Sequence, residues 1–478
     1  MLKTAQEVPP DLVRGLGAWS AAAVVIGGTI GTGIFLVPSQ MARDVGSAWG
    51  VTAVWLAGGV VILFGVFCYA ELGAALPQAG GEYVYLSRAL GPLWGFLFGW
   101  KGSVLSYPAI IATVAAGLLR FAGFLIPSLS GQLFTWNFSI PLRAHPFSLT
   151  MSKAQLWSAV AILVVAAVNY FGVRTAGRVQ VVLTSLKIGV LLAIVILGVA
   201  LPSGGPAKAN GSVASQVAGG ISGYFLALVS ATWAYSGFSD LGLVGGEILN
   251  PQKSIPRAAI LGVVSVVGLY VVVNIIYFHV LGVSRVAVSQ HVASDLAVSL
   301  IGGRGARWLT VGMIISSLGA LHAQFLKFPR VAYAMARDGR FFRFAGRVQP
   351  TFRTPSAAIL FEACVAIILV LTGAFEELYS TAVFAVALFE LLLAIAVIRL
   401  RGNEPSLPRP YQAWGFPWTP LIFGAVVFGM VLNLWLARPI RCSIGFAAIL
   451  LGIPFYRHWS QKEAEPSPAV VRQNSGWL

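Results

Sequence analysis

Long apolar stretches separated by short polar segments recur along the whole chain of 478 residues. A bilayer core about 30 Å thick requires roughly 20 apolar residues per helix, and twelve stretches reach that length when isolated charges are allowed inside them. Backbone polar groups in lipid need internal partners, and the ten-residue alternating strands of a membrane barrel are absent, so the pattern predicts α-helices. The predicted fold is an all-α integral membrane protein with twelve transmembrane helices. Their predicted cores are 18–38, 49–75, 92–120, 154–171, 179–201, 218–248, 257–281, 308–335, 355–373, 378–398, 417–436 and 441–459.

The composition supports this class and excludes others. Apolar residues make up 57% of the chain and charged residues 10%, whereas an average soluble domain carries roughly a quarter charged residues. Mean hydropathy is +0.82, while a disordered chain needs low hydrophobicity and a disulfide-stapled secreted module needs dense cysteine. The three cysteines, Cys68, Cys364 and Cys442, lie in or beside apolar segments. They are predicted to be small buried hydrophobic residues rather than bridges or metal ligands.

The basic residues indicate how the chain is oriented. A net charge of +16 would suggest nucleic acid in a soluble protein, but Lys and Arg also orient membrane proteins. With the loops assigned alternately from a cytoplasmic N-terminus, 19 of the 32 basic residues fall inside, 10 outside and 3 at membrane depth. The polar start of the chain predicts no cleavable signal. We therefore expect a multi-pass protein of the cell (inner) membrane with both termini cytoplasmic and no nucleic-acid partner.

Two predicted spans contain glycine-rich interruptions. The first span holds GGTIGTGIF at 27–35, and the sixth holds TWAYSGFSDLGLVGGE at 232–247. Glycine is a poor helix former, and breaks at corresponding positions of two halves indicate an inverted-repeat transporter. We predict a five-plus-five inverted repeat with broken helices 1 and 6. The predicted divisions are a cytoplasmic N-terminal segment (1–17), a first repeat (18–201), a second repeat (202–399), helices 11 and 12 (400–460) and a cytoplasmic tail (461–478).

Unwound backbone at these breaks suits a zwitterion. Amides of Gly31, Thr32 and Gly33 would point into a cavity beside the positive end of the next half-helix, which favours a carboxylate. Carbonyls before the break would accept from an ammonium group, and an amino acid offers both groups. The alternative is that the small residues only let helices pack closely. At the second break, Trp233 and Tyr235 lie mid-span rather than at a span end, which favours a gate over an interfacial belt.

Three motifs resemble those of a known family. They are GGTIGTGIF, WAYSGF followed by GEILNPQKSIPRAAI (246–260), and GALHAQFLKFPRVAYAMARDGRFF (319–342) with TP at 354–355. In this order they resemble the amino acid–polyamine–organocation (APC) superfamily, L-type amino acid transporter branch, across about 20–460. The resemblance implies the inverted-repeat fold, alternating access, and Trp233 as the extracellular gate. It also implies the substrate-binding residues Ile26, Thr29, Ile30, Gly31, Thr32, Gly33, Trp233, Ala234, Tyr235 and Ser236.

Lys187 is a lysine in the middle of an apolar span. Such a group costs a few kcal/mol on insertion scales and usually faces an interior polar partner, here predicted to be carbonyls freed at the first break. The resemblance implies that its ammonium takes the place of a sodium ion. The alternatives are a lysine that snorkels to the interface and a lysine whose titration couples transport to protons.

The other charged residues refine the prediction of substrate. The resemblance implies an Asp in place of Ser236 for dibasic substrates, so Ser236 favours neutral amino acids, although Asp240 would partly compensate or cap a half-helix. Lys101 and Lys327 are expected to snorkel. Three glutamates near predicted cytoplasmic ends are expected to pair with loop arginines such as Arg337 in a closing network; they are Glu71, Glu82 and Glu247. Glu362 and Glu390 lie deeper and are expected to bond to a neighbouring helix, with a proton relay as the alternative.

The sequence therefore predicts a sodium-independent exchanger or facilitator of neutral L-amino acids. The alternative is a proton-coupled symporter of amino acids or polyamines, and a channel or receptor on the same fold is a further possibility. No metal-ligand spacing, phosphate loop or paired catalytic carboxylates appear, so no enzyme, metal or cofactor is predicted. The loop 121–153 has no cysteine, which predicts a stand-alone carrier without a disulfide-linked accessory subunit.

Overall fold

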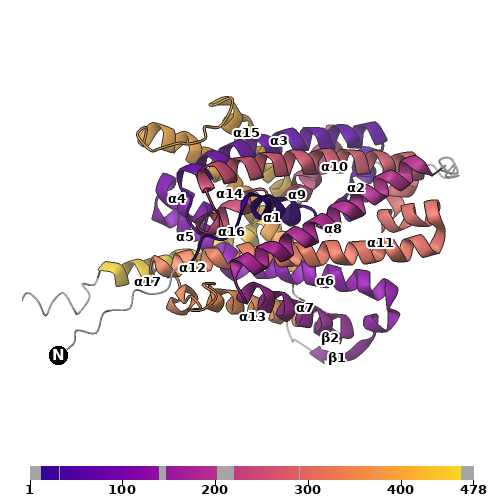
Figure 1. The fold of residues 1–478 in the computed structure, drawn as a ribbon, viewed down its shortest axis with the longest axis horizontal. Helices are drawn as coiled ribbons and strands as arrows, with labels where there is room; N and C mark the ends of the chain where they lie inside the picture. The colour runs from indigo at the N-terminus through magenta and orange to yellow at the C-terminus, as the bar shows by residue number, and fades with distance from the viewer. Residues whose placement is uncertain are drawn as a thin grey trace, which may run out of the picture.

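The computed structural model describes residues 12–31, 33–138, 147–201, 220–289, 291–373 and 375–464. Its helices run roughly alongside one another and form an elongated bundle (Figure 1). The first half contains α1 (Ala18–Thr29), α2 (Gly33–Val45), α3 (Ala48–Ala75), α4 (Glu82–Leu90), α5 (Pro92–Trp100), α6 (Tyr107–Leu125), β1 (Gln132–Phe138), β2 (Phe147–Ser152), α7 (Lys153–Tyr170) and α8 (Val173–Ala200). The second half contains α9 (Ile221–Ala234), α10 (Pro251–Val288), α11 (Val292–Lys327), α12 (Pro329–Arg337), α13 (Ser356–Thr372), α14 (Phe375–Asn403), α15 (Trp418–Ala437), α16 (Pro439–Leu450) and α17 (Gly452–Ala464).

Every predicted span core overlaps one of these helices. Among the described residues, eight helical runs are long and apolar enough to cross a membrane, and α1 and α13 are shorter apolar helices. The chain is thus a multi-pass helical membrane protein, while the count of twelve spans and the inverted repeat stay predictions. The eight runs are Ala48–Ala75, Pro92–Leu125, Lys153–Tyr170, Val173–Ala200, Pro251–Val288, Arg307–Arg337, Trp418–Leu436 and Pro439–Gln461.

Both glycine-rich spans are interrupted in the structure. The first divides into α1 and α2, and Ile30 between them has an extended backbone (φ −72°, ψ 91°). The sixth is α-helical only through α9, after which the chain continues in two short 3-10 helices, η4 (Ser239–Leu243) and η5 (Gly245–Glu247). Neither span is a continuous rod, so backbone groups near the middle of the bundle lack the regular helical partners.

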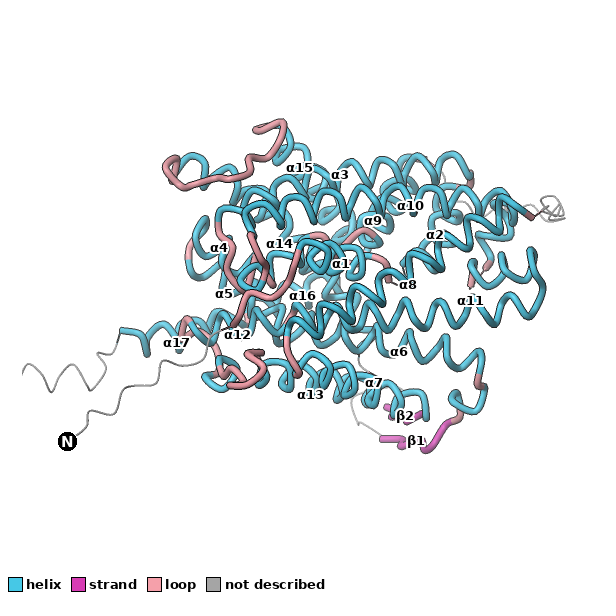
Figure 2. The backbone as a smooth tube through the Cα atoms, in the orientation of Figure 1, coloured by secondary structure: helices cyan, strands magenta, loops and turns pink. Residues whose placement is uncertain are grey.

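One short β-hairpin accompanies the helices. Strands β1 and β2 pair antiparallel, with Phe138 opposite Phe147. At seven and six residues they are shorter than a membrane strand, and they lie between α6 and α7, so a search for long apolar segments does not detect them. Figure 2 shows the hairpin at the opposite end of the bundle from α17. The short helix α4 was not predicted either, because its nine residues are amphipathic rather than apolar.

The broken helices lie in the centre of the bundle. Helix α1 packs against α8 and α10, and α2 packs against α9. Helix α11 packs against α6 and α8 and also contacts α1 and η4. The two interruptions are therefore surrounded by long helices, which brings residues near 30, 187, 235 and 325 together although they are far apart in the sequence (Figure 1).

Candidate functional site

The two interrupted segments meet backbone to backbone. Gly237 has φ +121°, a conformation that glycine adopts readily. A Cβ atom on Gly237 would lie 3.0 Å from the carbonyl carbon of Gly28 and 3.0 Å from the amide nitrogen of Thr29. A Cβ atom on Gly33 would lie 3.2 Å from the Cβ of Ala234. The glycines at both breaks therefore allow a contact too close for larger residues. Gly237 was not among the predicted site residues, although its place in the motif was visible.

We expect Gly237→Ala to reduce both stability and amino acid uptake. The left-handed conformation costs a non-glycine residue about 1–3 kcal/mol, and the added methyl group would push the two breaks apart. Thermal unfolding in detergent and uptake by proteoliposomes measure the two effects. Gly189→Ala is the matched control, because a Cβ there meets no atom within 4 Å. Equal behaviour of the two variants would contradict the packing argument.

The first break exposes a helix N-terminus to the site. Helix α2 begins at Gly33, so the N–H groups of its first turn have no acceptor inside the helix. The aligned peptide dipoles place partial positive charge there, which favours an anionic group. Gly31 and Gly33 both line a cavity of about 140 Å³. Thr32, predicted to contribute an amide here, lies outside the described residues.

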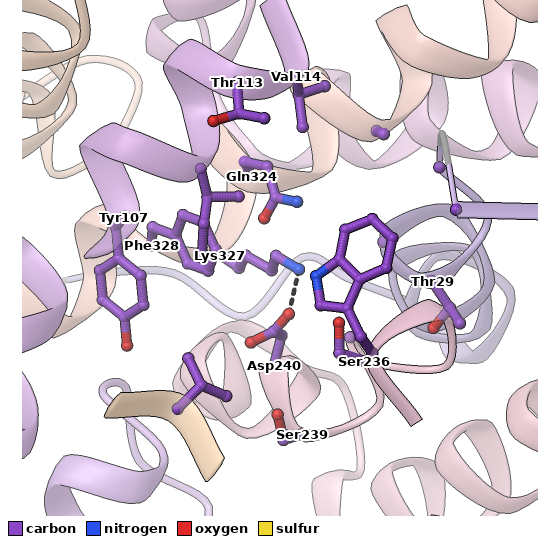
Figure 3. Close-up of a pocket in the computed structure, with 18 of the residues that line it drawn as sticks. Thr29, Tyr107, Thr113, Val114, Ser236, Ser239, Asp240, Gln324, Lys327 and Phe328 are labelled. Atoms are coloured by element: carbon purple, nitrogen blue, oxygen red, sulfur yellow. Dashed lines mark hydrogen bonds and ion pairs between the residues drawn. The ribbon is translucent and has the colours of Figure 1, made fainter. Parts of the chain in front are cut away.

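The structure brings six of the ten predicted substrate-binding residues to this cavity. They are Thr29, Gly31, Gly33, Trp233, Ala234 and Ser236. The cavity also contacts α5, α6, α11 and α14, and Figure 3 shows Thr29, Ser236, Asp240, Gln324 and Lys327 around it. The isoleucine pair, Ile26 and Ile30, instead lines a separate groove beside α8 and α10.

Tyr235 points away from the cavity into a buried aromatic cluster. Its ring stacks on Tyr270 and meets Trp55 edge-on, with ring centroids 5.4 and 5.3 Å apart. Its hydroxyl donates to the backbone oxygen of Trp55 at 3.1 Å. Tyr270 in turn donates to the oxygen of Thr29, the last residue of α1, at 3.1 Å. The cluster therefore supports both breaks from behind the cavity.

Lys187 lies on the other side of the first break. Its Nζ donates to the backbone oxygens of Gly27 at 2.9 Å and Ile30 at 2.7 Å. The side chain is fully buried, so the snorkelling alternative is wrong. A buried ammonium is tolerated only where it is hydrogen-bonded or paired, and here the carbonyls at the end of α1 supply that environment.

A polar row on α8 continues from Lys187. Thr184 donates to the oxygen of Ala23 at 3.0 Å, and Gln180 donates to the same oxygen at 3.3 Å. Gln180 also contacts Nδ1 of His322 on α11 at 2.8 Å. Sequence reasoning missed these residues. The spacing of 180, 184 and 187 places them on one helical face, and that periodicity was the available signal.

The expectation that Lys327 and Lys101 snorkel is wrong. Lys327 is 1% exposed and forms an ion pair with Asp240 across the cavity (Figure 3). Lys101 is 2% exposed, and its Nζ lies 4.9 Å from the ring centroid of Phe98. Asp240 therefore pairs with a lysine instead of capping a half-helix. These positions depend on how α5, α11 and η4 pack, which hydropathy does not encode.

The predicted partners of the glutamates also need correction. Glu247 pairs with Arg330 on α12, not with Arg337, through two hydrogen bonds of 2.8 and 3.2 Å, and both side chains are fully buried. Glu82 lines the cavity together with Ser239.

Glu390 and Glu362 show two different environments. Glu390 lines the cavity and interacts electrostatically with Lys101. Glu362 is fully buried, and among the described residues neither of its oxygens has a hydrogen-bond partner. The expected bond from Glu362 to a neighbouring helix is therefore wrong.

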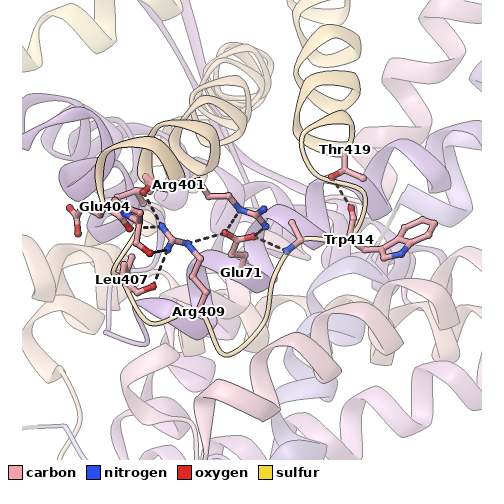
Figure 4. Close-up of polar contacts among 10 residues, drawn as sticks. Glu71, Arg401, Glu404, Leu407, Arg409, Trp414 and Thr419 are labelled. Carbon is pink, nitrogen blue, oxygen red and sulfur yellow. Dashed lines mark hydrogen bonds and ion pairs between the residues drawn. The ribbon is translucent and has the colours of Figure 1, made fainter.

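Glu71 does pair with arginines, at one end of the bundle. Arg401 donates to its two oxygens at 2.9 and 2.6 Å, and Arg409 approaches to 3.4 Å (Figure 4). The amide of Ala413 also donates to Glu71, at 2.6 Å. Arg409 further donates to backbone oxygens of 400 and 404. This network fixes the loop between α14 and α15 against α3.

The geometry therefore combines unwound backbone, a buried ammonium and a small cavity with several charged and polar side chains in its lining, in the centre of a membrane bundle. The sequence profile described as "Amino acid permease" matches residues 16–453. The chain belongs to the amino acid permease family. It is thus a member of the APC superfamily, in the L-type branch, and it is a transporter of amino acids.

Alignments with relatives from bacteria and animals cover nearly the whole chain. The Serine/threonine exchanger SteT of Bacillus subtilis is 29% identical over 458 residues, covering 95% of this chain and 98% of the relative. The Large neutral amino acids transporter small subunit 2 of Rattus norvegicus is 29% identical, covering 94% and 82%. The b(0,+)-type amino acid transporter 1 of Homo sapiens is 27% identical, covering 95% and 91%.

Proposed function

We propose that this permease is a sodium-independent exchanger or facilitator of neutral L-amino acids that works by alternating access. The observation that carries the proposal is the contact of the Lys187 ammonium with the oxygens of Gly27 and Ile30. The lysine side chain already interacts with the carbonyls that the family resemblance assigns to a sodium ion. A second cation there would meet like-charge repulsion in a low-dielectric environment.

The substrate is proposed to bind between the two interruptions. The N–H groups at the start of α2 suit its carboxylate, and the carbonyls near Ile26 and Trp233 suit its ammonium. The oxygens of Ile26 and Trp233 already accept from Ile30 and Ser236, and each carbonyl has a second lone pair for the substrate. Trp233 would close the cavity on the outer side. Ser236 lines the cavity without a charge, which suits a neutral side chain.

The relatives support exchange and the class of substrate. Their names describe a serine/threonine exchanger and a large neutral amino acids transporter subunit, and both properties are proposed for this permease. We further propose a cell-membrane location, cytoplasmic termini, twelve spans and the repeats 18–201 and 202–399. The loop 121–153 has no cysteine, so we propose that the permease acts without a disulfide-linked subunit.

The test is uptake into proteoliposomes with a panel of radiolabelled amino acids. Neutral L-amino acids should compete for uptake, and internal amino acid should stimulate it. Replacement of sodium by choline should change the uptake rate by less than about twofold. A large fall in choline would contradict sodium independence. Indifference to every amino acid would contradict the substrate class.

Proton coupling is a second candidate, favoured by one observation. Glu362 is fully buried with no hydrogen-bond partner among the described residues, and acidic residues inside membrane bundles commonly belong to proton relays. An imposed pH gradient in the same proteoliposomes separates the two candidates. Stimulation that is lost in Glu362→Gln would support the symporter, and uptake indifferent to the gradient would support the exchanger or facilitator.

A further inference from the structure

The cavity has a second polar region, which adjoins the unwound backbone and consists of side chains. Lys327 and Asp240 form an ion pair between α11 and η4, and both line the cavity. The Asp240 side chain is 20% exposed, while the Lys327 side chain is 1% exposed. The pair therefore presents its carboxylate to the cavity and keeps the lysine stem buried. A Cβ atom on Gly28 would lie 3.0 Å from Nζ of Lys327, so the pair begins beside the first break and extends away from it along the cavity wall.

Two oxygen atoms near the ion pair can accept further hydrogen bonds. Gln324 lies one helical turn before Lys327, is 6% exposed and lines the cavity. Its Oε1 is buried and has no hydrogen-bond partner in the described part of the chain. Asp240 makes its hydrogen bond through Oδ2, which leaves Oδ1 available to accept. Figure 3 shows Gln324, Lys327 and Asp240 turned toward the same space. Buried polar groups normally have partners, so an unpartnered one that lines a cavity indicates a polar ligand.

We propose that Asp240, Lys327 and Gln324 form the subsite for the substrate's side chain, and that this subsite selects a hydroxyl group over a methyl group of equal size. The inference rests on the proposed function, because it assumes that an amino acid binds at the two breaks. It adds which neutral amino acids fit and which side chains decide.

A hydroxyl group matches this subsite chemically. It donates one hydrogen bond, which Oε1 of Gln324 or the Asp240 carboxylate accepts, and it accepts another, which the Lys327 ammonium donates. A methyl group in the same place would remove water from the ion pair and leave these groups without partners. A site built to hydrogen-bond a substrate hydroxyl rejects an analogue that lacks it far more strongly than an apolar pocket rejects an extra hydroxyl.

Threonine and valine make the sharpest comparison. They have nearly the same shape and differ by a hydroxyl in place of a methyl group, so differences in size do not contribute. We expect threonine to compete for uptake at least about tenfold better than valine, since each unpartnered buried group costs enough for a change of that order. Competition against one radiolabelled substrate in proteoliposomes gives the ratio directly.

Two variants test which residues carry the preference. In Asp240→Leu/Lys327→Met the pair is replaced by apolar side chains of similar volume, which buried pairs often tolerate without loss of stability. Gln324→Leu changes a single amide, and it keeps the test usable where the double variant does not fold. Each should lower the threonine/valine ratio at least about threefold, and the double variant should bring it near one. Arg88→Met/Glu404→Leu is the matched control, because that ion pair is 58% and 28% exposed and lies outside the cavity lining.

The outcomes separate this inference from the proposed function. Competition by threonine and valine with equal strength, or an unchanged ratio in both variants, would overturn the subsite while leaving amino acid transport intact. No competition by any amino acid would overturn the proposed function and the subsite with it. A fall in the ratio confined to the two subsite variants would support the proposal.

Discussion

Lys187→Ala is expected to lower amino acid uptake by a factor of about 10 to 100 or more. The substitution removes the donor to Gly27 and Ile30 and leaves two buried carbonyls without that partner. Each orphaned group costs about 1–3 kcal/mol, and every 1.4 kcal/mol is a tenfold change in an equilibrium. Without the ammonium, the end of α1 loses the contact that orients it toward the cavity. Uptake by proteoliposomes containing equal amounts of protein is the measurement.

Two further variants separate charge from packing. Lys187→Met keeps most of the buried stem and removes the charge, so it should lose nearly as much uptake as the alanine variant. Lys253→Ala removes an exposed lysine at the start of α10 and should behave like the unaltered protein. Size-exclusion profiles after heating report whether each variant is folded. Full uptake by a folded Lys187→Met protein would show that the charge is not required.

The second large effect is expected for Arg330→Met. This variant should destabilise the protein by about 3–5 kcal/mol, because it leaves one charge of a buried pair without its partner. Both side chains of the Arg330–Glu247 pair are fully buried. The backbone oxygen of Glu247 also accepts from the amides of Gly15 and Leu16. Arg330 therefore ties α12 to the segment that follows the second break and to the beginning of the described chain. Thermal unfolding should reveal the loss, together with reduced uptake.

The double variant Arg330→Met/Glu247→Leu distinguishes stability from gating. Apolar replacement of a whole buried pair is often neutral or stabilising, so the folded state should largely recover. Uptake should stay low if this pair must close and open during transport. Arg88→Met provides the control, because its pair with Glu404 is exposed and screened by solvent, so its loss should change stability little. Recovery of both stability and uptake in the double variant would assign the pair a structural role alone.

Hydropathy located the helical segments well because lipid leaves a chain few choices. Each predicted core overlaps a helix, and the glycine-rich positions in 27–35 and 232–247 fall where the helices are interrupted. The same method missed β1, β2 and α4, which are short and not uniformly apolar. The position of Lys187 in an apolar span predicted an interior partner, and the structure supplies it at Gly27 and Ile30.

The pairing of charges was the least predictable part of the site. Lys101 and Lys327 were expected at the interface and are buried, and Glu247 pairs with Arg330 rather than Arg337. The sequence indicates how far a charged residue lies from the ends of its own membrane span. It does not report which neighbouring helix faces that charge, and a charge at membrane depth takes its partner from the helix that faces it.

The sequence alone determined the protein's class, its helical segments, its two interruptions and its family resemblance. These features follow from local rules, since a bilayer requires long apolar helices and glycine weakens them. Only the tertiary structure decided that Tyr235 leaves the cavity, that Gly237 contacts the first break, and that Asp240, Lys327 and Gln324 share one space. Contacts between helices far apart in the chain depend on how their faces pack, and the hydropathy of a single helix carries no information about that packing.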